Sequence, residues 1–353
     1  MKEYIVLGVM SGTSLDGIDL AICSLNIDKS WTFEILEATT IPYSAEWKTK
    51  LSKANTLLAY DFIKLHKEYG CFIGKTINHF LATAKVKPNF ISSHGHTIFH
   101  QPLKKITFQI GDGAEIASET GITTISDFRS FDVALGGQGA PLVPIGDKLL
   151  FANYDYRLNL GGFANISNNH EDKVLAYDIC PVNIVINNLM ETIGQPYDRD
   201  GETAQKGTIN KALLTELNNL AFYKQSAPKS LGKEWIDENI FPIMAKQTLS
   251  LPNLLRTFYE HVAMQIGNNV KSNKLKSVLI TGGGAYNKFL ISLLSNYSDC
   301  NFIVPQNQIV EFKEALIFAL LGVLRLRNEA NCLSSVTGAK YNNVGGVVHQ
   351  VNK

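Results

Sequence analysis

The first forty residues alternate between apolar runs and short polar turns, a pattern that predicts an antiparallel meander. Residues 4–9, 18–25 and 31–38 are rich in Ile, Val, Leu or aromatic side chains, and Gly, Ser, Asp or Asn separate them. Such runs are typical of β-strands. Apolar residues then recur every three or four positions over 57–84, which predicts a long amphipathic helix, and 90–93 predicts one more short strand.

The second half of the chain repeats this plan. Three further strand patterns come first, and helix and strand patterns then alternate, so a duplicated α/β architecture is expected. No residue-level repeat links the two halves. The expected elements are strands at 156–160, 163–167, 174–179 and 277–280, and helices at 184–192, 251–270 and 314–327.

The length of 353 residues suits two domains, at about 150 residues for a typical domain. The Gly- and Pro-rich stretch 136–144 is the best linker candidate, with a hinge near 136–139. We therefore expect a first lobe of residues 1–140, joined by about 330–353 from the C-terminus, and a second lobe of residues 141–329.

Composition narrows the classes of partner. A chain that is 45% hydrophobic and 18% charged can build sizeable cores, and a net charge of +1 argues against a nucleic-acid or anionic-membrane partner. Five cysteines without a C-x-x-C pair indicate a reduced, cytoplasmic chain. The apolar run at 315–324 is too short to span a membrane, and the N-terminus lacks a signal-peptide core. Any anionic ligand therefore needs a local site.

The segment GVMSGTSLDGID at 8–19 is the strongest chemical signal. It lies between two predicted strands and combines small residues, hydroxyls and carboxylates, which suit backbone contacts to phosphate and a hydrated Mg²⁺. An ordinary hairpin turn is the alternative. Neither a P-loop nor a strand-to-helix GxGxxG motif is present. The predicted nucleotide contacts are Gly12, Thr13, Ser14, Leu15, Asp16, Gly17, Ile18 and Asp19, with Asp16 or Asp19 orienting Mg²⁺.

Two more glycine-rich turns follow predicted strands. LGGFANIS at 160–167 is a second hairpin, and TGGGAYN at 281–287 follows an apolar strand and opens a helix. Exposed N–H groups at such turns can donate hydrogen bonds to phosphate, and the flat backbone of glycine can pack against the face of an adenine. Three turns of this kind, spread over both halves, indicate a bound nucleotide more strongly than one does. The predicted contacts here are Gly161, Gly162, Asn165, Gly282, Gly283 and Gly284.

Nine segments, distributed from end to end of the chain, carry a family resemblance. They are GVMSGTSLDGID at 8–19, SSHGHTIFHQP at 92–102, FQIGDGAEIA at 108–117, DFRSFDVALGGQGAPLVP at 127–144, LGGFANIS at 160–167, DRDG at 198–201, PKSLGKEW at 228–235, TGGGAYN at 281–287 and EALIFALL at 314–321. On these segments the sequence resembles the anhydro-N-acetylmuramic acid kinases, a family in the superfamily of actin, sugar kinases and heat-shock ATPases.

The resemblance implies a fold and an activity. The fold would be two-lobed, actin-like and ribonuclease H-like, with ATP in an interdomain cleft. The enzyme would be a phosphotransferase with an alcohol acceptor. It would open 1,6-anhydro-N-acetylmuramic acid with water and phosphorylate the freed 6-oxygen, giving N-acetylmuramic acid 6-phosphate in peptidoglycan recycling. ATP and Mg²⁺ would be required, and the family is typically homodimeric.

The resemblance also implies residue roles, each with an ordinary alternative. Asp178 would be the base that activates water, or else a cap for the following helix. Arg129 would hold the lactyl carboxylate of the sugar, or else pair on the surface with Asp127 or Asp132. Glu314 would touch the sugar, or else simply complement a helix dipole. The remaining sugar-side positions are His94, Thr97, Gln138 and Asn183.

The chain departs from the usual family pattern near the base and elsewhere. Cys180 and Val182 replace both glycines of the usual D-x-G-P-G-N motif, His96 stands where Gln is usual, and Tyr286 stands where His is common. Bulk beside the base is expected to narrow the pocket or shift the backbone. The alternatives are then a kinase of a related anhydro sugar, or an actin-like nucleotide-binding protein without sugar kinase activity.

Three closely spaced histidines, His94, His96 and His100, leave a zinc site as a further alternative. On an extended strand, His94 and His96 would share one face. The segment has no Asp or Glu at ligand spacing, which disfavours zinc.

Overall fold

The computed structural model describes residues 2–12, 14–170, 173–227, 229–271 and 273–352. The chain divides into unit 1, made of Met1–Leu150 and Phe312–Lys353, and unit 2, made of Phe151–Glu311. These boundaries differ from the expected ones at residues 140 and 329. The stretch 136–144 belongs to unit 1 because the buried carboxylate of Asp132 accepts the N–H of Gly139 at 2.8 Å and holds this loop in place.

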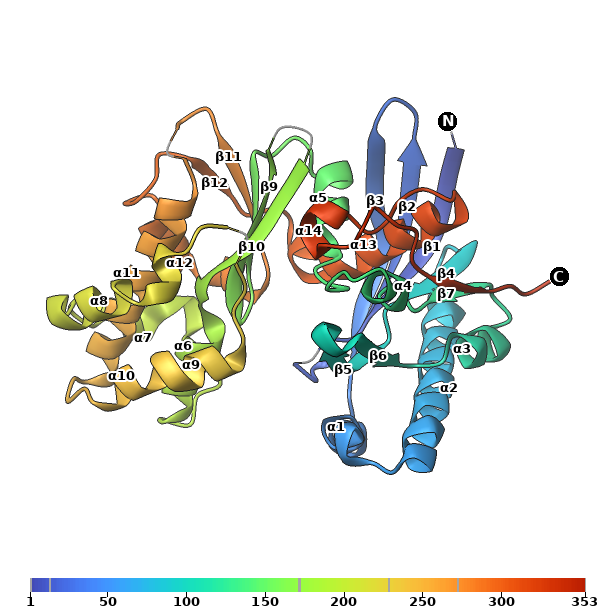
Figure 1. Ribbon diagram of the computed structural model, residues 1–353, viewed down its shortest axis with the longest axis horizontal. Coiled ribbons are helices and arrows are strands. Elements are labelled where there is room, and N and C mark those ends of the chain that lie inside the picture. The colour runs from blue at the N-terminus through green and yellow to red at the C-terminus, as the bar shows by residue number, and fades with distance from the viewer. Residues whose placement is uncertain (1, 13, 171–172, 228, 272, 353) are drawn as a thin grey trace. The chain divides into compact units, whose positions relative to one another are not determined.

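Unit 1 contains a six-stranded sheet in the order β13-β7-β4-β1-β2-β3. Its first three strands form the expected antiparallel meander, and β4 and then β7 add parallel to it (Figure 1). The C-terminal strand pairs antiparallel on the edge. The strands are β1 (Lys2–Met10), β2 (Gly17–Ile27), β3 (Trp31–Pro42), β4 (Phe90–Ser93), β7 (Thr124–Ser126) and β13 (Val347–His349).

Two long helices pack on the unit 1 sheet. The predicted amphipathic helix is α2 (Ala59–Thr83), whose buried Tyr69, Ile73 and Ile77 join Leu7 in one apolar cluster. The last long helix is α13 (Asn307–Leu326), and a Cβ on Gly8 would lie 1.9 Å from the carbonyl oxygen of Ala315. Only glycine therefore permits this approach of β1 to α13.

Shorter elements complete unit 1. They are α1 (Ala45–Ser52), η1 (Ala54–Thr56), β5 (His96–Gln101), η2 (Pro102–Lys104), β6 (Ile106–Ile110), α3 (Gly113–Thr120), α4 (Ser130–Ala134), α5 (Val143–Leu150) and α14 (Ser334–Thr337). Strands β5 and β6 form a separate antiparallel hairpin that the sequence pattern did not predict.

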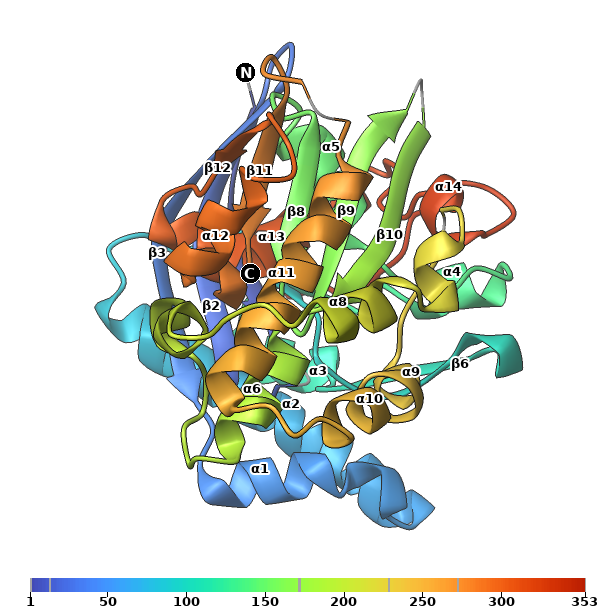
Figure 2. The ribbon, with the colours of Figure 1, turned by 90° about the vertical axis from the view of Figure 1, so that its left-hand side faces the viewer.

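Unit 2 repeats the plan of unit 1. Its five strands run in the order β10-β9-β8-β11-β12, again an antiparallel meander whose first strand pairs with a parallel fourth one (Figure 2). The strands are β8 (Tyr156–Leu160), β9 (Phe163–His170), β10 (Lys173–Pro181), β11 (Ser277–Thr281) and β12 (Asn301–Ile303). The third-second-first-fourth-fifth order in both units confirms the duplicated α/β architecture.

The core of unit 2 lies between this sheet and its helices. Helix α11 (Leu251–Asn269) runs across the sheet in Figure 2 and buries Phe258, Val262 and Ile266. The other helical elements are α6 (Asn183–Glu191), η3 (Arg199–Gly201), α7 (Glu202–Gln205), α8 (Lys211–Asn218), η4 (Ala221–Lys224), α9 (Lys233–Asn239), α10 (Phe241–Ala245), η5 (Gly283–Tyr286) and α12 (Lys288–Leu294).

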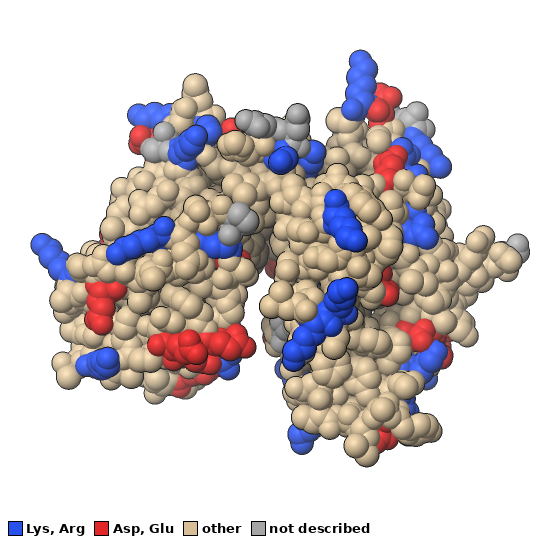
Figure 3. All heavy atoms as spheres, viewed as in Figure 1, with Lys and Arg blue, Asp and Glu red and all other residues tan. Residues whose placement is uncertain are grey.

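Positive and negative side chains both occur on the viewed face of each unit, as the small net charge leads one to expect (Figure 3). Within the described ranges, none of the helices has the length and apolar character that crossing a membrane requires.

Candidate functional site

The glycine hairpin of unit 1 connects β1 to β2. Thr13 lies outside the described residues. A Cβ on Gly17 would lie 2.4 Å from the carbonyl oxygen of Ile41, so this glycine serves the approach of β3. Among the described residues, a Cβ on Gly12 would meet only the Ser14 hydroxyl, at 3.6 Å. The fold does not need a glycine at position 12, and the space it leaves suits an anion that approaches the backbone.

The acidic residues of this hairpin differ in setting. Asp16 is exposed, whereas Asp19 on β2 is half-buried and accepts a hydrogen bond from the Thr40 hydroxyl at 2.6 Å. Ile18 lies between them with its side chain fully buried in the core of unit 1. Because side chains alternate along a strand, only the backbone of Ile18 could touch a ligand.

Arg129 precedes α4 and holds a fixed orientation in unit 1. Its Nε and Nη2 lie 3.0 and 2.9 Å from Nε2 of His94, and its Nη1 donates to the carbonyl oxygen of Gly139 at 2.6 Å. Among the described residues it forms no ion pair with Asp127 or Asp132, so the alternative of a surface pair is wrong. Desolvation lowers the pKa of Arg129 to about 10, which leaves the guanidinium charged at neutral pH.

His94 orients Arg129 and does not act as a metal ligand. Its Nδ1 lies 3.0 Å from the carbonyl oxygen of Gly95, so Nδ1 donates and Nε2 accepts from Arg129. Burial and the charge of Arg129 hold the pKa of His94 well below its usual range. His96 begins β5, and Gly95, at φ 73°, separates it from β4, so the two imidazoles do not share a strand face as expected. In the described part of the chain, no three His, Cys, Asp or Glu side chains are grouped to hold a metal ion.

The other predicted sugar-side residues of unit 1 are less constrained. The Thr97 hydroxyl accepts a hydrogen bond from Gln109 at 3.3 Å, and the exposed Gln138 is held through its backbone N–H, which donates to Thr337. Glu314 lies on α13, where desolvation raises its pKa and the charge of Arg129 lowers it. Asp19 also raises the pKa of Glu314, so this carboxylate is within electrostatic reach of both the hairpin and the arginine.

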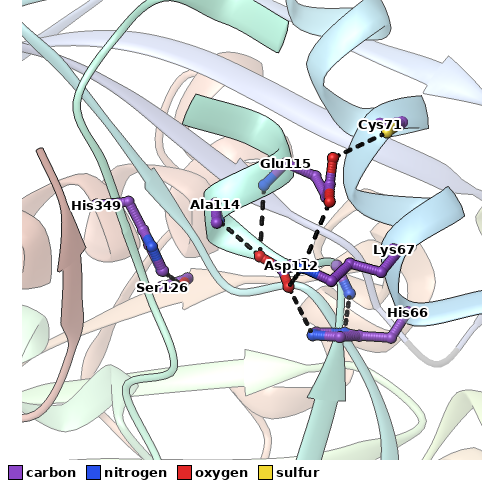
Figure 4. Close-up of polar contacts among 9 residues, drawn as sticks. His66, Lys67, Cys71, Asp112, Ala114, Glu115, Ser126 and His349 are labelled. Atoms are coloured by element: carbon purple, nitrogen blue, oxygen red, sulfur yellow. Dashed lines mark hydrogen bonds and ion pairs between the residues drawn. The ribbon is translucent and has the colours of Figure 1, made fainter. Parts of the chain in front are cut away.

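A polar cluster supports the loop that carries His94 and His96. Asp112, which caps α3, accepts from Lys67 at 2.6 Å, and His66 on the same stretch of α2 accepts the N–H of Gly111 at 3.1 Å (Figure 4). A Cβ on Gly111 would lie 3.5 Å from Cα of Gly95. The FQIGDG segment thus packs beneath the turn of the HGHT segment.

The predicted base lies in a polar row on the unit 2 sheet. Asn159, Asn165 and Asp178 are direct cross-strand neighbours on β8, β9 and β10. Oδ2 of Asp178 accepts the N–H of Leu231 at 2.8 Å and the hydroxyl of Ser230 at 3.1 Å. No described residue hydrogen-bonds Oδ1. Burial raises the pKa of Asp178, while the bonds from Leu231 and Ser230 lower it.

These contacts exclude the alternative in which Asp178 caps the following helix. Helix α6 begins at Asn183, and its N-cap, Val182, makes no side-chain cap bond. The carboxylate of Asp178 bonds instead to the loop at 230–231, so it does not cap that helix. A half-buried carboxylate with one oxygen fixed and the other unpaired is suited to accept a proton from water.

The glycine turns of unit 2 meet at the ends of β8 and β11. Gly282, at φ 82°, and Gly284 would place a Cβ 2.5 Å from Oδ1 of Asn159 and 2.7 Å from Cβ of Leu160, so both glycines are needed for close packing. Within the part of the chain that the structure describes, a Cβ on Gly283 would meet only Nδ2 of Asn183, at 3.9 Å. Open space thus remains at position 283. Gly161 and Gly162 form the adjacent turn, whose carbonyl oxygens accept from the start of α6.

Asn183 links these turns. Its Nδ2 donates to the carbonyl oxygen of Leu160 at 3.1 Å and lies near Gly284. This contact gives the half-buried Asn183 a structural role in holding the two glycine turns together.

Cys180 and Val182 do not line the space beside the base. Both side chains are fully buried in the core of unit 2. A β-bulge between Asp178 and Cys180 pairs Cys180 with Ala164 and so turns its side chain to the buried face, away from Asp178. The expected narrowing of the pocket by these two side chains is therefore wrong. Tyr286, the other departure in unit 2, donates to Oε1 of Glu311 at 2.9 Å.

Several site-supporting residues were missed from the sequence. Ser230 and Leu231 orient Asp178 from more than fifty positions away, and no spacing rule links such positions. Ser11 and Tyr43 contact each other beneath the hairpin, again from distant positions. Ser11, Ser230 and Leu231 lie in segments that carry the family resemblance, but nothing in those segments gives them these partners, and Tyr43 lies outside them.

The chain is similar to a well-populated family of kinases. The sequence model described as anhydro-N-acetylmuramic acid kinase matches residues 4–351. A Francisella tularensis subsp. novicida protein of that name is 36% identical over 370 residues, with 96% of this chain and 97% of the relative covered. The proteins of the same name from Hydrogenovibrio crunogenus and Mannheimia succiniciproducens are 36% and 34% identical, with at least 96% of this chain covered.

These relatives are sugar phosphotransferases by name, and they match this chain along nearly its whole length. The match includes both glycine-rich units, the Arg129 loop and the Asp178 strand. The chain belongs to the anhydro-N-acetylmuramic acid kinase family.

Proposed function

We propose that this protein binds ATP and uses Asp178 as the base that adds water to 1,6-anhydro-N-acetylmuramic acid during peptidoglycan recycling. Water oxygen bonds to the anomeric carbon, the bond from that carbon to the 6-oxygen breaks, and the 6-oxygen takes the γ-phosphoryl group of ATP. The products are N-acetylmuramic acid 6-phosphate and ADP. The observation that carries the proposal is that no described residue hydrogen-bonds Oδ1 of Asp178, in a member of this kinase family.

Asp178 would accept the proton that the attacking water loses. Its raised pKa makes the carboxylate a stronger base than a solvated aspartate. The Leu231 N–H and the Ser230 hydroxyl hold Oδ2, so Oδ1 keeps one direction toward the water. Such orientation supports catalysis because a base contributes only when it is held within hydrogen-bond reach.

Arg129 would bind the lactyl carboxylate of the sugar. A guanidinium has five N–H donors, and three of those of Arg129 point to His94 and Gly139. The remaining two, one on each terminal nitrogen, match the two oxygens of a carboxylate. His94 would thus act on the substrate through Arg129 rather than by direct contact.

The phosphates would lie against the backbone of the unit 1 hairpin, where Gly12 leaves open space. Mg²⁺ usually takes one or two carboxylates together with phosphate oxygens and waters, so Asp16 and Asp19 fit this ion without a larger acidic cluster. When bound, Mg²⁺ would neutralise charge that develops on the phosphates. In unit 2, the open position at Gly283 would suit a further part of the nucleotide.

A labelling assay tests the reaction. The protein is incubated with Mg²⁺, ATP and 1,6-anhydro-N-acetylmuramic acid in ¹⁸O-water, and the products are analysed by mass spectrometry. We expect a sugar phosphate with ¹⁸O at the anomeric carbon and none in the phosphate. ATP binding without sugar-dependent ADP release would instead identify a nucleotide-binding protein without this activity.

We also propose that the enzyme is a cytoplasmic homodimer. A homodimeric, cytoplasmic enzyme agrees with the resemblance and with five cysteines in the thiol form. Light scattering coupled to size exclusion, at micromolar protein, tests the dimer. A single species with the 39.0 kDa mass of one chain would contradict it.

A further inference from the structure

A buried polar cluster lies directly beneath the glycine hairpin of unit 1. We infer that Tyr43 and His96 act through Ser11 as a hairpin clamp, defined here as Ser11, Tyr43 and His96, that positions the phosphate-binding backbone. The inference rests on the proposed function, because it assumes that the hairpin binds the phosphates of ATP. It gives these three residues a positioning role that the sequence did not predict.

Tyr43 forms hydrogen bonds with the hairpin at two points. Its hydroxyl lies 2.6 Å from the hydroxyl of Ser11, which immediately precedes Gly12. Its backbone N–H donates to the carbonyl oxygen of Asp16 at 3.2 Å, on the other side of the same hairpin. One residue therefore joins the outgoing and returning arms, and the segment between them carries the open position at Gly12.

His96 is the second hydrogen-bond partner of the Ser11 hydroxyl. Its Nδ1 lies 2.9 Å from the Ser11 hydroxyl, so this hydroxyl has partners on both sides. Ser11, Tyr43 and His96 are all buried. A buried hydroxyl that loses a partner cannot replace it with water at no cost, so each contact resists movement of the hairpin.

Proton counting gives one consistent arrangement of these hydrogen bonds. Behind the clamp, the hydroxyl of the fully buried Tyr69 bonds to the hydroxyl of Tyr43, and a hydrogen bond with Ser11 lowers the pKa of Tyr69. If Tyr69 donates to Tyr43, then Tyr43 donates to Ser11, and Ser11 donates to Nδ1 of His96. Every hydroxyl proton then has an acceptor. In this arrangement Nδ1 of His96 is the acceptor.

His96 must then be neutral to accept. Burial lowers its pKa to about 4, which agrees with an unprotonated Nδ1 at neutral pH. A side chain that offers an acceptor at the same place, such as the amide oxygen of Gln, could replace it. An apolar side chain of similar size could not.

Two pairs of variants test the clamp. Tyr43→Phe and Tyr69→Phe each remove one buried hydroxyl, but only the first removes the 2.6 Å contact with the Ser11 hydroxyl. His96→Leu removes the acceptor, and His96→Gln retains one. For each variant, the Kd of Mg·ATP is measured by calorimetry and the KM of the sugar by steady-state kinetics. Amide hydrogen exchange of the hairpin is followed in the ligand-free protein.

We expect Tyr43→Phe and His96→Leu to weaken Mg·ATP binding by about tenfold and to speed exchange at the hairpin, with the sugar KM unchanged. We expect Tyr69→Phe and His96→Gln to stay within about twofold of wild type. Equal Kd values for Tyr43→Phe and Tyr69→Phe would overturn the clamp.

The exchange measurement separates the two hypotheses. If the wild type binds no nucleotide, the proposed function fails. Faster hairpin exchange in Tyr43→Phe than in Tyr69→Phe would still support the clamp in that case, and equal exchange would overturn it. A thermal midpoint lowered equally in both Phe variants would show only the shared loss of one buried hydroxyl.

Discussion

Arg129 donates to one acceptor through two nitrogens, since its Nε and Nη2 lie 3.0 and 2.9 Å from Nε2 of His94. A protonated Nε2 could not accept either bond, so His94 is neutral, in agreement with its strongly lowered pKa. The neutral imidazole sets the plane of the guanidinium without cancelling its charge. The charge stays available to a ligand.

The first prediction concerns this geometry. Arg129→Lys keeps the positive charge but loses the planar fork, so two bonds to His94 and the paired donors for a carboxylate disappear. We expect the sugar KM to rise by about tenfold or more, from the loss of one charge-assisted bond, while the Kd of Mg·ATP is unchanged. An unchanged sugar KM would contradict carboxylate recognition by Arg129.

The second prediction concerns the base. The Ser230 hydroxyl lowers the pKa of Asp178, so Ser230→Ala should raise it. Because activity requires the ionised carboxylate, the acid limb of the kcat/KM profile should move to higher pH in this variant. Asp178→Asn is the reference: it should abolish turnover and leave the Kd of ATP unchanged. A Ser230→Ala profile that overlies the wild-type profile would argue against Asp178 as the titrating group.

The third prediction concerns the family departures beside the base. Val182 is fully buried in the unit 2 core, so Val182→Ala should destabilise the protein by about 1–3 kcal/mol without changing sugar preference. The matched control is Val304→Ala in the same unit, where the side chain is exposed and little loss is expected. Denaturant unfolding and kcat/KM on two anhydro sugars give both readouts. If Val182→Ala changed the sugar preference and left the stability unchanged, this would show that Val182 lines the sugar pocket after all.

The fourth prediction is a pH dependence of stability. Burial lowers the pKa of His96 from 6.5 to about 4. Below pH 6.5 the unfolded chain takes up a proton that the folded chain does not, so stability is lost as the pH falls from 6.5 toward 4. His96→Gln cannot titrate, and its stability loss between pH 6.5 and 5 should be smaller by up to about 2 kcal/mol.

His261 provides a comparison in unit 2. Burial lowers its pKa to about 3, so it adds a similar acid sensitivity in the wild type and in His96→Gln alike. The difference between the two proteins therefore isolates His96. Identical losses on acidification would show that His96 does not titrate as this burial implies.

Most strands and long helices could be predicted because their apolar spacing is regular. The first meander, α2, β8 and β11 all lie where the pattern put them. The unit boundaries could not be predicted this way. A Gly- and Pro-rich stretch usually marks a linker, but Asp132 holds the stretch 136–144 inside unit 1 through contacts with Gly139, Thr337 and Asn343.

The candidate site, like the unit boundaries, could be predicted only in part from the sequence. Asp178 and Arg129 were named through family motifs, and the polar row around Asp178 follows from strand register. The burial of Cys180 depends on one bulge, and no pattern of residue types in the sequence marks its position. The donors to Asp178 and the hairpin clamp come together only in the folded chain, because tertiary packing joins segments that have no fixed spacing.

The approach of Gly8 to Ala315 has a consequence for synthesis on the ribosome. Unit 2 is one continuous segment, whereas unit 1 needs both chain ends, including α13 and β13. Domains generally fold as their segments emerge, so unit 2 can complete its sheet while β1 still lacks its helix. A truncated product that ends before residue 312 would leave Asp132 without Thr337 and Asn343. The Arg129 loop therefore depends on residues that are made last, and we expect products truncated before residue 312 to be inactive.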